Sequence, residues 1–287
     1  MKPLHVLWKK PTDAGAYTGG SWVETGGLSL GNLATQDVME LTRSADTAEA
    51  STWWRCDLGR LTPLSMFAIL NHNGSTVARR RHVVTNSPTN AGTPVYDTGW
   101  QRMRTPTEVW GARPFGAFPF DGIDTEAYPG GLVDLHVAPS TVYGRYLFTY
   151  LSDVDNAAGY LQAGRFMAGE VWTQSMAFGV KIKPSDPSEA RRTRGGRRIV
   201  RKLPGYREVS ITFEHMTERD AMTTGFEIDR QLGKSGDFLL VYDPDDAPAV
   251  RFRRTIYAAL TDTTGITTTT ATKPRRYGWG ITAEELI

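Results

Sequence analysis

The residues with the clearest chemical potential form a basic cluster in the second half of the chain. The cluster consists of Arg191, Arg192, Arg194, Arg197 and Arg198. Two glycines, Gly195 and Gly196, lie among these arginines and suit a tight turn, so the sequence predicts an arginine-rich hairpin. Its guanidinium groups could bind phosphate or nucleic acid, pair with carboxylates of a neighbouring subunit, or remain solvated. The subunit contact is favoured over nucleic acid, because no aromatic residues are interleaved to stack bases.

Catalytic and metal-binding motifs are absent from the sequence. There is no Gly-x-Ser-x-Gly elbow, no P-loop, no glycine-rich dinucleotide motif and no His-Glu-x-x-His pair. The five histidines are scattered and lack the spacing of metal ligands. We therefore expect no enzyme activity, no cofactor and no metal. A glycan hydrolase is the lesser alternative, which would need two of the carboxylates of Asp121, Asp124 and Glu126 to converge.

Sugar binding is a separate hypothesis for the first part of the chain. Sugar sites commonly stack an aromatic ring on the apolar face of a pyranose and surround it with polar groups. Residues of these kinds are available at Trp22, Asn71, Asn73 and Trp110. If the chain binds a glycan, we expect these four residues to take part.

Composition limits the class of protein. Of the 287 residues 40% are hydrophobic and 22% charged, as in ordinary globular proteins, and the net charge of +2 is too small to require a nucleic-acid or membrane partner. A single cysteine, Cys56, excludes an internal disulfide, and its apolar neighbours predict a buried position. The N-terminus lacks the apolar core of a signal peptide, and no stretch approaches the roughly 20 apolar residues of a membrane span. We expect synthesis in a cytoplasm.

The elements of the first part are predicted to be strands. Residues 65–70 form an apolar run bounded by turn residues, which is typical of a strand buried on both faces. The polar residues 71–82 predict a loop before the next strand, and further short strands with almost no helix indicate a β-sandwich. Residues 105–131 are aromatic but without a period, and predict a long insertion. The character of the sequence changes near residue 175.

The second part contains one convincing helix, over residues 217–232. Thr217 and Asp220 resemble a capping box with Asp in place of Glu, and Gly233 suits the position after the helix. One face, predicted to pack on a sheet, combines Ala221, Met222, Gly225, Phe226, Ile228 and Leu232. Residues 250–260 are predicted to form a strand.

The first part resembles the discoidin-like, or galactose-binding-like, jelly-roll family. The resemblance rests on Trp54-Arg55-Cys56-Asp57-Leu58-Gly59, Tyr143-Gly144-Arg145-Tyr146-Leu147 and Gly164-Arg165-Phe166. It implies a jelly-roll sandwich, whereas the ligand loops of that family vary and imply no particular ligand. The insertion over 105–131 departs from a minimal domain of this family.

The whole chain is similar to tail-tip proteins of tailed bacteriophages, which join such a sandwich to a ring-forming domain. This similarity rests on Gly164-Arg165-Phe166-Met167-Ala168-Gly169, Gly195-Gly196, residues 207–213, Tyr242-Asp243-Pro244 and Tyr277-Gly278-Trp279-Gly280-Ile281. It implies that the second part has a distal-tail or tail-tube fold and forms rings around the tail axis.

The sequence thus predicts a mainly β protein. A jelly-roll sandwich over residues 1–175 is followed by a smaller tail-tube-like sandwich over 176–287, flanked by one α-helix. The predicted function is a structural virion protein of the tail tip, with the jelly-roll as an appendage for bracing or host attachment. The alternative is a carbohydrate-binding module or receptor-binding protein.

The resemblance also implies partners. These are other copies of the chain in a ring, with a hexamer expected and a trimer as the alternative, and the neighbouring tail-tube, hub and tape-measure proteins. A host surface glycan is a further candidate. We expect no sequence-specific nucleic acid and no membrane span, and a final location in the virion tail tip.

Overall fold

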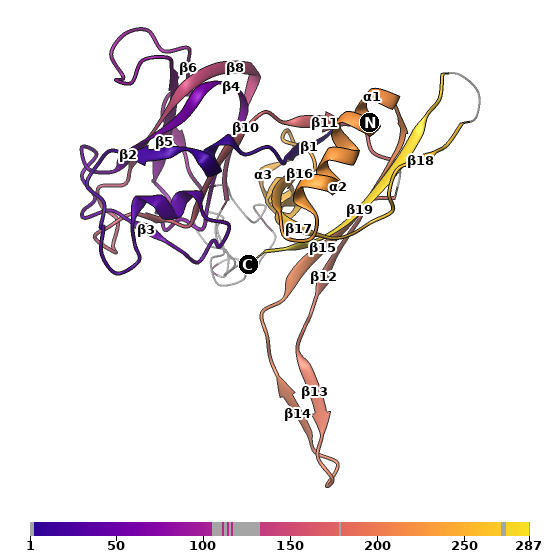
Figure 1. The fold of residues 1–287 in the computed structure, drawn as a ribbon. Coiled ribbons are helices and arrows are strands. Elements are labelled where there is room, and N and C mark those ends of the chain that lie inside the picture. Colours follow the sequence, from indigo (N-terminus) through magenta and orange to yellow (C-terminus); the bar gives the residue numbers. More distant parts are fainter. Residues whose placement is uncertain are drawn as a thin grey trace. The chain divides into compact units, whose positions relative to one another are not determined.

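The computed structural model describes residues 3–104, 133–177, 179–270 and 274–286, together with 111, 114 and 116. Among these described residues, strands account for 47% and helices for 12%, which confirms the mainly β class (Figure 1). The chain divides into two units, each built from separate stretches of sequence. Unit 1 contains Met1–Val6, Thr173–Asp243 and Ile256–Ile287, and unit 2 contains Leu7–Trp172 and Pro244–Thr255.

Unit 2 is a β-sandwich with short helices in its connections. Its elements are two 3-10 helices, η1 (Pro11–Ala14) and η2 (Leu30–Ala34), the strands β2 (Ala16–Thr18), β3 (Thr42–Arg43), β4 (Trp53–Leu70), β5 (Arg79–Thr85), β6 (Tyr96–Asp97), β7 (Gln101–Arg102), β8 (Val133–Ser152), β9 (Gln162–Ala163) and β10 (Arg165–Gly169), and the helix α3 (Pro248–Arg254). The main sheet has the order β10-β4-β8-β5-β6, while β2 pairs with β4 and β7 pairs with β5.

The long strands β4 and β8 form the centre of this sheet. They pair antiparallel along their length, with register shifts after Asp57 and after Leu64, and Gly59 adopts a φ of 73° that glycine tolerates. Such irregularities bend a strand pair. The bend brings the two halves of the sheet face to face. As a result, Phe67 of β4 stacks on His82 of β5, with ring centroids 5.2 Å apart.

The core of unit 2 is centred on Trp54, which is fully buried and packs edge-on against Trp22 and Phe166. The predicted central strand is confirmed, because residues 65–70 are all buried. Cys56 is also buried and unpaired, as expected, and burial raises the pKa of its thiol to about 12. A thiol of this kind is an apolar core group rather than a nucleophile.

Unit 1 is built on one large sheet and one helical segment. Its elements are β1 (Leu4–Leu7), β11 (Trp172–Gln174), β12 (Lys181–Ser185), β13 (Glu189–Arg192), β14 (Arg198–Arg201), β15 (Tyr206–Met216), α1 (Glu218–Asp220), a π-helical turn (Ala221–Gly225), α2 (Phe226–Leu232), β16 (Asp237–Val241), β17 (Thr255–Thr263), β18 (Thr267–Thr268) and β19 (Tyr277–Glu285). The sheet order is β11-β1-β16-β17-β19-β15-β12, and β18 pairs with β19. The N-terminal strand β1 therefore lies inside a sheet formed mostly by the last third of the chain.

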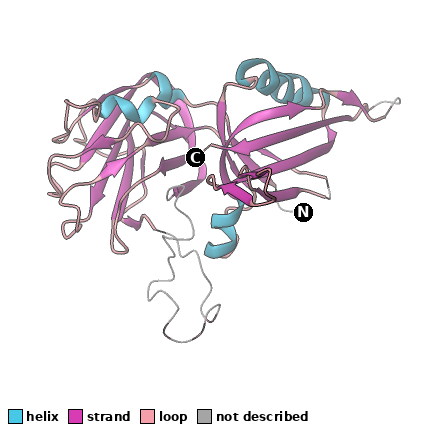
Figure 2. Cartoon of the chain, turned by 90° about the horizontal axis from the view of Figure 1, so that it is seen from below, coloured by secondary structure: helices cyan, strands magenta, loops and turns pink. Residues whose placement is uncertain are grey.

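The helical segment from Glu218 to Leu232 lies on this sheet (Figure 2). Its N-terminus is capped as predicted, since Thr217 Oγ1 accepts a hydrogen bond from the Asp220 backbone N–H at 3.1 Å. Gly225 faces Trp279 of β19, and a Cβ atom there would lie in ordinary van der Waals contact with the indole ring, at 3.4 Å. Ring stacking between Trp279 and Phe213, with centroids 5.3 Å apart, continues the core below the helix.

The predicted buried face of this helix is wrong at two positions. Met222 and Phe226 are 45% and 51% exposed, whereas Ala221, Ile228 and Leu232 are buried. Met222 and Phe226 each follow a buried position by one residue, which places them roughly a quarter of a turn further around the helical segment. The spacing in the sequence is compatible with burial of either the row through Ala221 or the row through Met222. Contact with the sheet buries the row through Ala221.

The predicted strand over 250–260 is also wrong in its first half, where α3 extends to Arg254 and β17 begins only at Thr255. Local hydrogen bonds favour the helix: Arg251 Nη1 donates to the Pro244 carbonyl at 3.1 Å, and Arg253 Nη1 donates to the Ala249 carbonyl at 2.9 Å. An ion pair of 2.8 Å between Arg254 and Asp246 closes the same turn.

Two sequence-based expectations concern other segments. The predicted insertion over 105–131 lies outside the described residues, apart from Gly111, Pro114 and Gly116. Among the helices of the described residues, none is long and apolar enough to cross a membrane.

Candidate functional site

A two-stranded hairpin extends from unit 1 well beyond the sheet (Figure 1). We call residues 189–201 the arm; they comprise β13, β14 and the turn between them. The strands pair from Glu189↔Arg201 to Arg192↔Arg198, and the Thr193 backbone N–H donates to the Arg197 carbonyl at 2.9 Å to close the turn. Gly196 has a φ of 81°, which explains the glycine at this position. The predicted basic hairpin is therefore present.

Every residue of the arm is exposed. The five arginines predicted to contact a subunit, Arg191, Arg192, Arg194, Arg197 and Arg198, all lie on it. With the described residues, their guanidinium groups form no hydrogen bond or ion pair. Two aliphatic side chains on β14 are also open to solvent, Ile199 at 40% and Val200 at 50%. The structure thus gathers the predicted residues on one projecting element, and their contact with a subunit stays a prediction.

The predicted sugar-binding residues do not gather in this way. Trp22 is 8% exposed, donates its indole N–H to the Trp53 carbonyl at 2.9 Å, and packs in the core. Asn71 Nδ2 donates to the Val38 carbonyl at 2.8 Å. Trp110 lies outside the described residues.

Asn73 has a similar structural role. Its Nδ2 donates to the Tyr160 carbonyl at 2.9 Å, and its Oδ1 accepts from the Gln162 backbone N–H at 2.8 Å. Both asparagines therefore tie loops of the sandwich together, and the buried Trp22 ring offers no surface for stacking. A role for these residues in sugar binding stays a prediction.

A polar pocket in unit 2 was not anticipated from the sequence. We call it the Arg80 pocket; its volume is about 330 Å³, at the small end of the range for ligand sites. It is lined by Arg80, Gln101, Arg102, Asp134, Leu135, His136, Val137, Pro244, Asp245 and Arg251. Most of these residues are polar, unlike the lining of a pocket for an apolar ligand.

A buried ion pair forms the floor of this pocket. Arg80 Nε donates to Asp134 Oδ2 at 2.7 Å, and the two side chains are only 2% and 3% exposed. Arg80 Nη1 donates to Gln101 Oε1 at 2.6 Å. Because Arg80 lies on β5 and Asp134 near the start of β8, the folded sheet brings together residues 54 positions apart.

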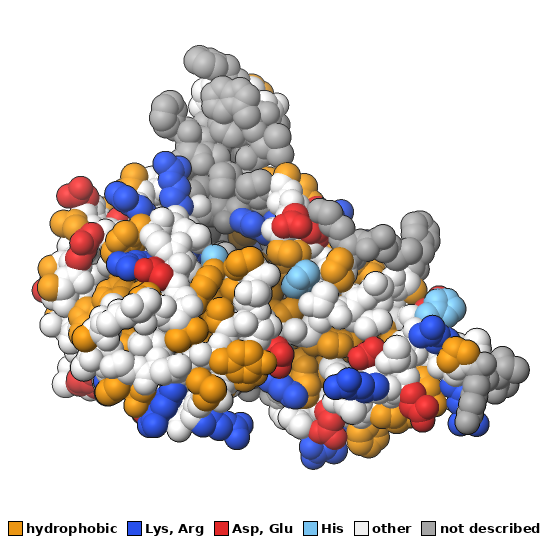
Figure 3. Space-filling model, turned by 90° about the horizontal axis from the view of Figure 1, so that it is seen from above, with side chains coloured by type: hydrophobic (Ala, Val, Ile, Leu, Met, Phe, Trp, Pro, Cys, Tyr) orange, Lys and Arg blue, Asp and Glu red, His pale blue; other side chains and the backbone are white. Residues whose placement is uncertain are grey.

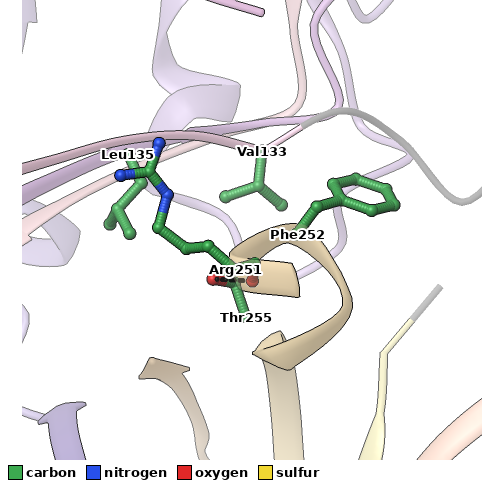
Figure 4. A pocket seen from close by; sticks show the side chains of 5 residues that line it. All are labelled: Val133, Leu135, Arg251, Phe252 and Thr255. Carbon is green, nitrogen blue, oxygen red and sulfur yellow. Dashed lines mark hydrogen bonds between the residues drawn. The ribbon is translucent and has the colours of Figure 1, made fainter. Parts of the chain in front are cut away.

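The helix α3 supplies a further cation, Arg251. Figure 4 shows the hollow beside the Arg80 pocket, where the Arg251 side chain extends toward Leu135 and Phe252 lies near Val133. Thr255 Oγ1 donates to the Arg251 carbonyl at 2.9 Å and closes the end of the helix. The helix α3 therefore packs against the start of β8 through apolar side chains, and Arg251 lines the wall of the Arg80 pocket.

The charges in the pocket influence one another. Burial raises the pKa of Asp134 to about 6, against the opposing effect of the Arg80 and Arg251 guanidinium groups. Burial and the charge of Arg80 lower the pKa of His136 to about 4, and its Nε2 lies 2.7 Å from the Tyr96 hydroxyl. At neutral pH the pocket therefore holds an ionised carboxylate and a neutral imidazole.

The sequence contains only a weak signal for this site. Residues 71–82 were predicted to form a loop, but β5 begins at Arg79, and strand alternation turns Arg80 inward between two outward-facing arginines. An inward arginine in a strand requires a buried acceptor, and the sequence could not identify Asp134 as that acceptor.

Unit 1 has a second surface feature, a hollow of about 580 Å³ beside the exposed Met222 and Phe226. Elsewhere charges are mixed: on the face seen in Figure 3, acidic and basic side chains are interspersed among apolar ones. Within the described residues no group of three or more His, Cys, Asp or Glu side chains is arranged to hold a metal ion.

Comparisons with known proteins find similarity only among solved structures. No protein-family model matches the sequence, and no curated protein matches it. A fucose-binding module from Streptococcus pneumoniae is 10% identical, with a TM-score of 0.37 and coverage of 56% of this chain and 94% of that chain. A fucolectin from striped bass (Morone saxatilis) serum is 13% identical, with a TM-score of 0.39 and coverage of 73% and 70%.

A chitosan-binding module from a chitosanase/glucanase of a Paenibacillus species is 14% identical, with a TM-score of 0.36 and coverage of 56% of this chain and 99% of that chain. These neighbours are carbohydrate-binding proteins, but identities and TM-scores this low do not assign the chain to their families. None of the findings supports a phage tail-tip protein.

The buried ion pair generates a stability prediction. Asp134→Leu should lower the free energy of unfolding by about 3–5 kcal/mol, because Arg80 would remain buried without a counter-charge. The double variant Arg80→Met/Asp134→Leu should recover most of this loss, since an apolar pair of similar volume leaves no unpaired charge. Urea unfolding of the full chain measures both. A single variant within about 0.5 kcal/mol of the wild type, as for an ordinary surface change, would contradict the assignment.

The pKa of Asp134 generates a second prediction. The folded value of about 6 exceeds the value of about 3.9 in an unfolded chain. Ionisation of Asp134 therefore costs more free energy in the folded chain than in the unfolded chain. The part of the free energy of unfolding linked to this ionisation is highest below about pH 3.9 and falls as the pH rises through the folded pKa. Above that pKa the ionised carboxylate still serves as the counter-charge of Arg80. A carboxyl NMR titration should show a midpoint near 6, shifted upward in Arg251→Gln because that cation favours the ionised form. A midpoint near or below 3.9 would refute this.

Proposed function

We propose that this chain is a structural subunit of a larger assembly, in which unit 1 contacts its neighbours through the arm. The observation that carries the proposal is that all residues of the arm are exposed on their own chain. An isolated two-stranded hairpin is at best marginally stable in water. A neighbouring subunit would bury Ile199 and Val200 and give the arm the packing that it lacks.

The distribution of charge supports a contact between copies of the chain. Six arginines and one glutamate give the arm a net charge of +5. Because the net charge of the whole chain is +2, all residues outside the arm together have a net charge of −3. A basic arm on an otherwise acidic chain favours contact with the body of a second copy, because guanidinium groups pair strongly with carboxylates. Such a head-to-tail contact satisfies every subunit when it closes into a ring.

The finer form of this proposal is a ring at the tip of a bacteriophage tail, and the sequence resemblance described above supports it. Six copies would surround the tail axis, with three as the alternative. Tail-tube, hub and tape-measure proteins would adjoin the ring, and unit 2 would brace neighbours or attach to the host surface.

The arm generates a prediction for assembly. Replacing Arg194, Arg197 and Arg198 with Glu should leave the melting temperature of the monomer unchanged, because exposed substitutions usually alter stability by only about 0.5 kcal/mol. Assembly should be lost, because each arginine–carboxylate hydrogen bond contributes about 1.5–3 kcal/mol and like charges would then repel. Sedimentation velocity at increasing concentration and particle imaging measure this outcome.

A matched control changes the same charge elsewhere. Arg60, Arg219 and Lys234 are exposed and lie off the arm, so their replacement with Glu should leave assembly intact. Equal assembly of the arm variant and the wild type would refute the proposal, as would images showing a single copy of the chain away from the axis of a particle.

Carbohydrate binding by unit 2 is the second candidate function, and the polar Arg80 pocket is the observation that favours it. The solved neighbours described above are a fucose-binding module, a chitosan-binding module and a fucolectin. Sugar binding by this chain is a proposal that the pocket alone supports. Hydroxyl-rich ligands suit a polar lining, because each hydroxyl can both donate and accept hydrogen bonds.

This second function predicts that the full chain binds glycans on an array above the background of a denatured sample. Because the role belongs to unit 2, the arm variant should give the same signals as the wild type. Signals indistinguishable from background across neutral and acidic glycans would exclude a carbohydrate-binding role.

A further inference from the structure

The geometry points to a specific ligand group for the Arg80 pocket: two adjacent hydroxyls of an uncharged pyranose, held between the Arg80–Asp134 pair and Arg251. This assignment rests on the carbohydrate-binding role proposed for unit 2, and it specifies both the site and the part of the sugar that is recognised. Trp22, Asn71 and Asn73, which the sequence suggested for sugar binding, do not line this pocket, and Trp110 lies outside the described residues.

The pocket contains hydrogen-bond donors that are not used by any group of the described residues. Arg80 has five N–H groups, of which three point to Asp134, Gln101 and the Leu135 carbonyl. Two N–H groups on Arg80 therefore remain without an acceptor among the described residues. With the described residues, the Arg251 guanidinium makes a single hydrogen bond, from Nη1 to the Pro244 carbonyl. Both forks are held in place by these contacts, so a ligand would meet oriented donors.

The pocket also contains an unused acceptor beside these donors. Asp134 binds Arg80 through Oδ2, and its Oδ1 receives no hydrogen bond from a described residue. One sugar hydroxyl can accept from a guanidinium group while its neighbour donates to this carboxylate oxygen. Hydrogen bonds to charged groups are the strong ones, so a pair of adjacent hydroxyls gains from both.

The carboxylate at the floor favours an uncharged ligand over an anion. The lining carries three guanidinium groups, those of Arg80, Arg102 and Arg251, and two carboxylates, those of Asp134 and Asp245. Asp134 lies directly against Arg80, with Arg80 Nε 2.7 Å from Asp134 Oδ2. A carboxylate or phosphate ligand would meet the ionised Asp134, whereas a diol needs that carboxylate as its acceptor.

The small size and polar lining of the pocket agree with this ligand. A volume of about 330 Å³ suits a single ring rather than a long chain. An apolar ligand would leave the guanidinium donors and the carboxylate oxygen without partners, which is costly in a buried site. The Arg80 pocket is therefore built for a polar group that both donates and accepts.

The test is an NMR titration of the full chain that follows the arginine Nε–Hε signals. The probes are methyl α-galactoside and methyl α-mannoside, with their 3-deoxy analogues, which lack adjacent hydroxyl pairs on the ring. At least one parent glycoside should shift the Arg80 and Arg251 signals, and its 3-deoxy analogue should bind at least about tenfold more weakly. Glucuronate and inorganic phosphate serve as anionic probes.

Two variants of α3 locate the binding site without disturbing the buried pair. Arg251→Gln removes the guanidinium fork at the pocket and should weaken glycoside binding at least about tenfold. Arg253→Gln is the matched control, because this exposed arginine lies two positions further along the same helix and does not line the pocket. Its binding should equal that of the wild type.

The outcomes separate this assignment from the carbohydrate-binding role itself. Binding of glucuronate or phosphate alone would show an oxyanion site and overturn the assignment. Glycoside binding that is unaffected by Arg251→Gln or by removal of the 3-hydroxyl would place the sugar elsewhere, and the broader role would stand. No binding of any probe, together with a glycan array at background, would reject both.

Discussion

The antiparallel pairing of β4 with β8 is the constraint on which unit 2 depends. These two strands provide the centre of the main sheet, and every other strand of that sheet is added to one of them or to β5. The register shifts after Asp57 and Leu64 bend the pair, so that one continuous ladder supplies both faces of the sandwich. Removal of either shift would displace the inward side chains from their partners, because strand side chains alternate between faces.

This bend also accounts for the Arg80 pocket. It places β5, with Arg80, opposite the first residues of β8, where Asp134 provides the counter-charge. An apolar pair of similar volume is often at least as stabilising as a buried ion pair. Stability alone therefore does not explain why charged side chains form the floor of a polar pocket.

Unit 1 differs from unit 2, because its most highly charged element, the arm, is exposed throughout and adds no side chain to the core of unit 1. The sheet is completed by the distant N-terminal strand β1, and Trp279 joins the sheet to the helical segment through its hydrogen bond to Asp229 at 3.0 Å. The arm is connected to this framework through β12 and β15, which pair from Lys181↔Ser210 to Ser185↔Tyr206. A paired sheet that carries a projecting basic hairpin is an arrangement suited to contact with another molecule.

Local patterns in the sequence determined the strand at residues 65–70, the burial of Cys56, the cap at Thr217 and the turn at Gly196. In each case the signal lies within a few neighbouring residues, because apolar runs, capping hydroxyls and glycines act over one turn or one strand. The arginine-rich hairpin was predictable for the same reason.

Tertiary structure decided the features that depend on distant partners. Only contact with the sheet distinguishes the buried stripe through Ala221 from the exposed one through Met222, and only the folded chain shows that β1 enters the sheet of unit 1. The pairing of Arg80 with Asp134 spans 54 residues, and no local pattern encodes it. A buried charge needs a counter-charge, but which residue supplies it is settled by how the long strands bend and meet.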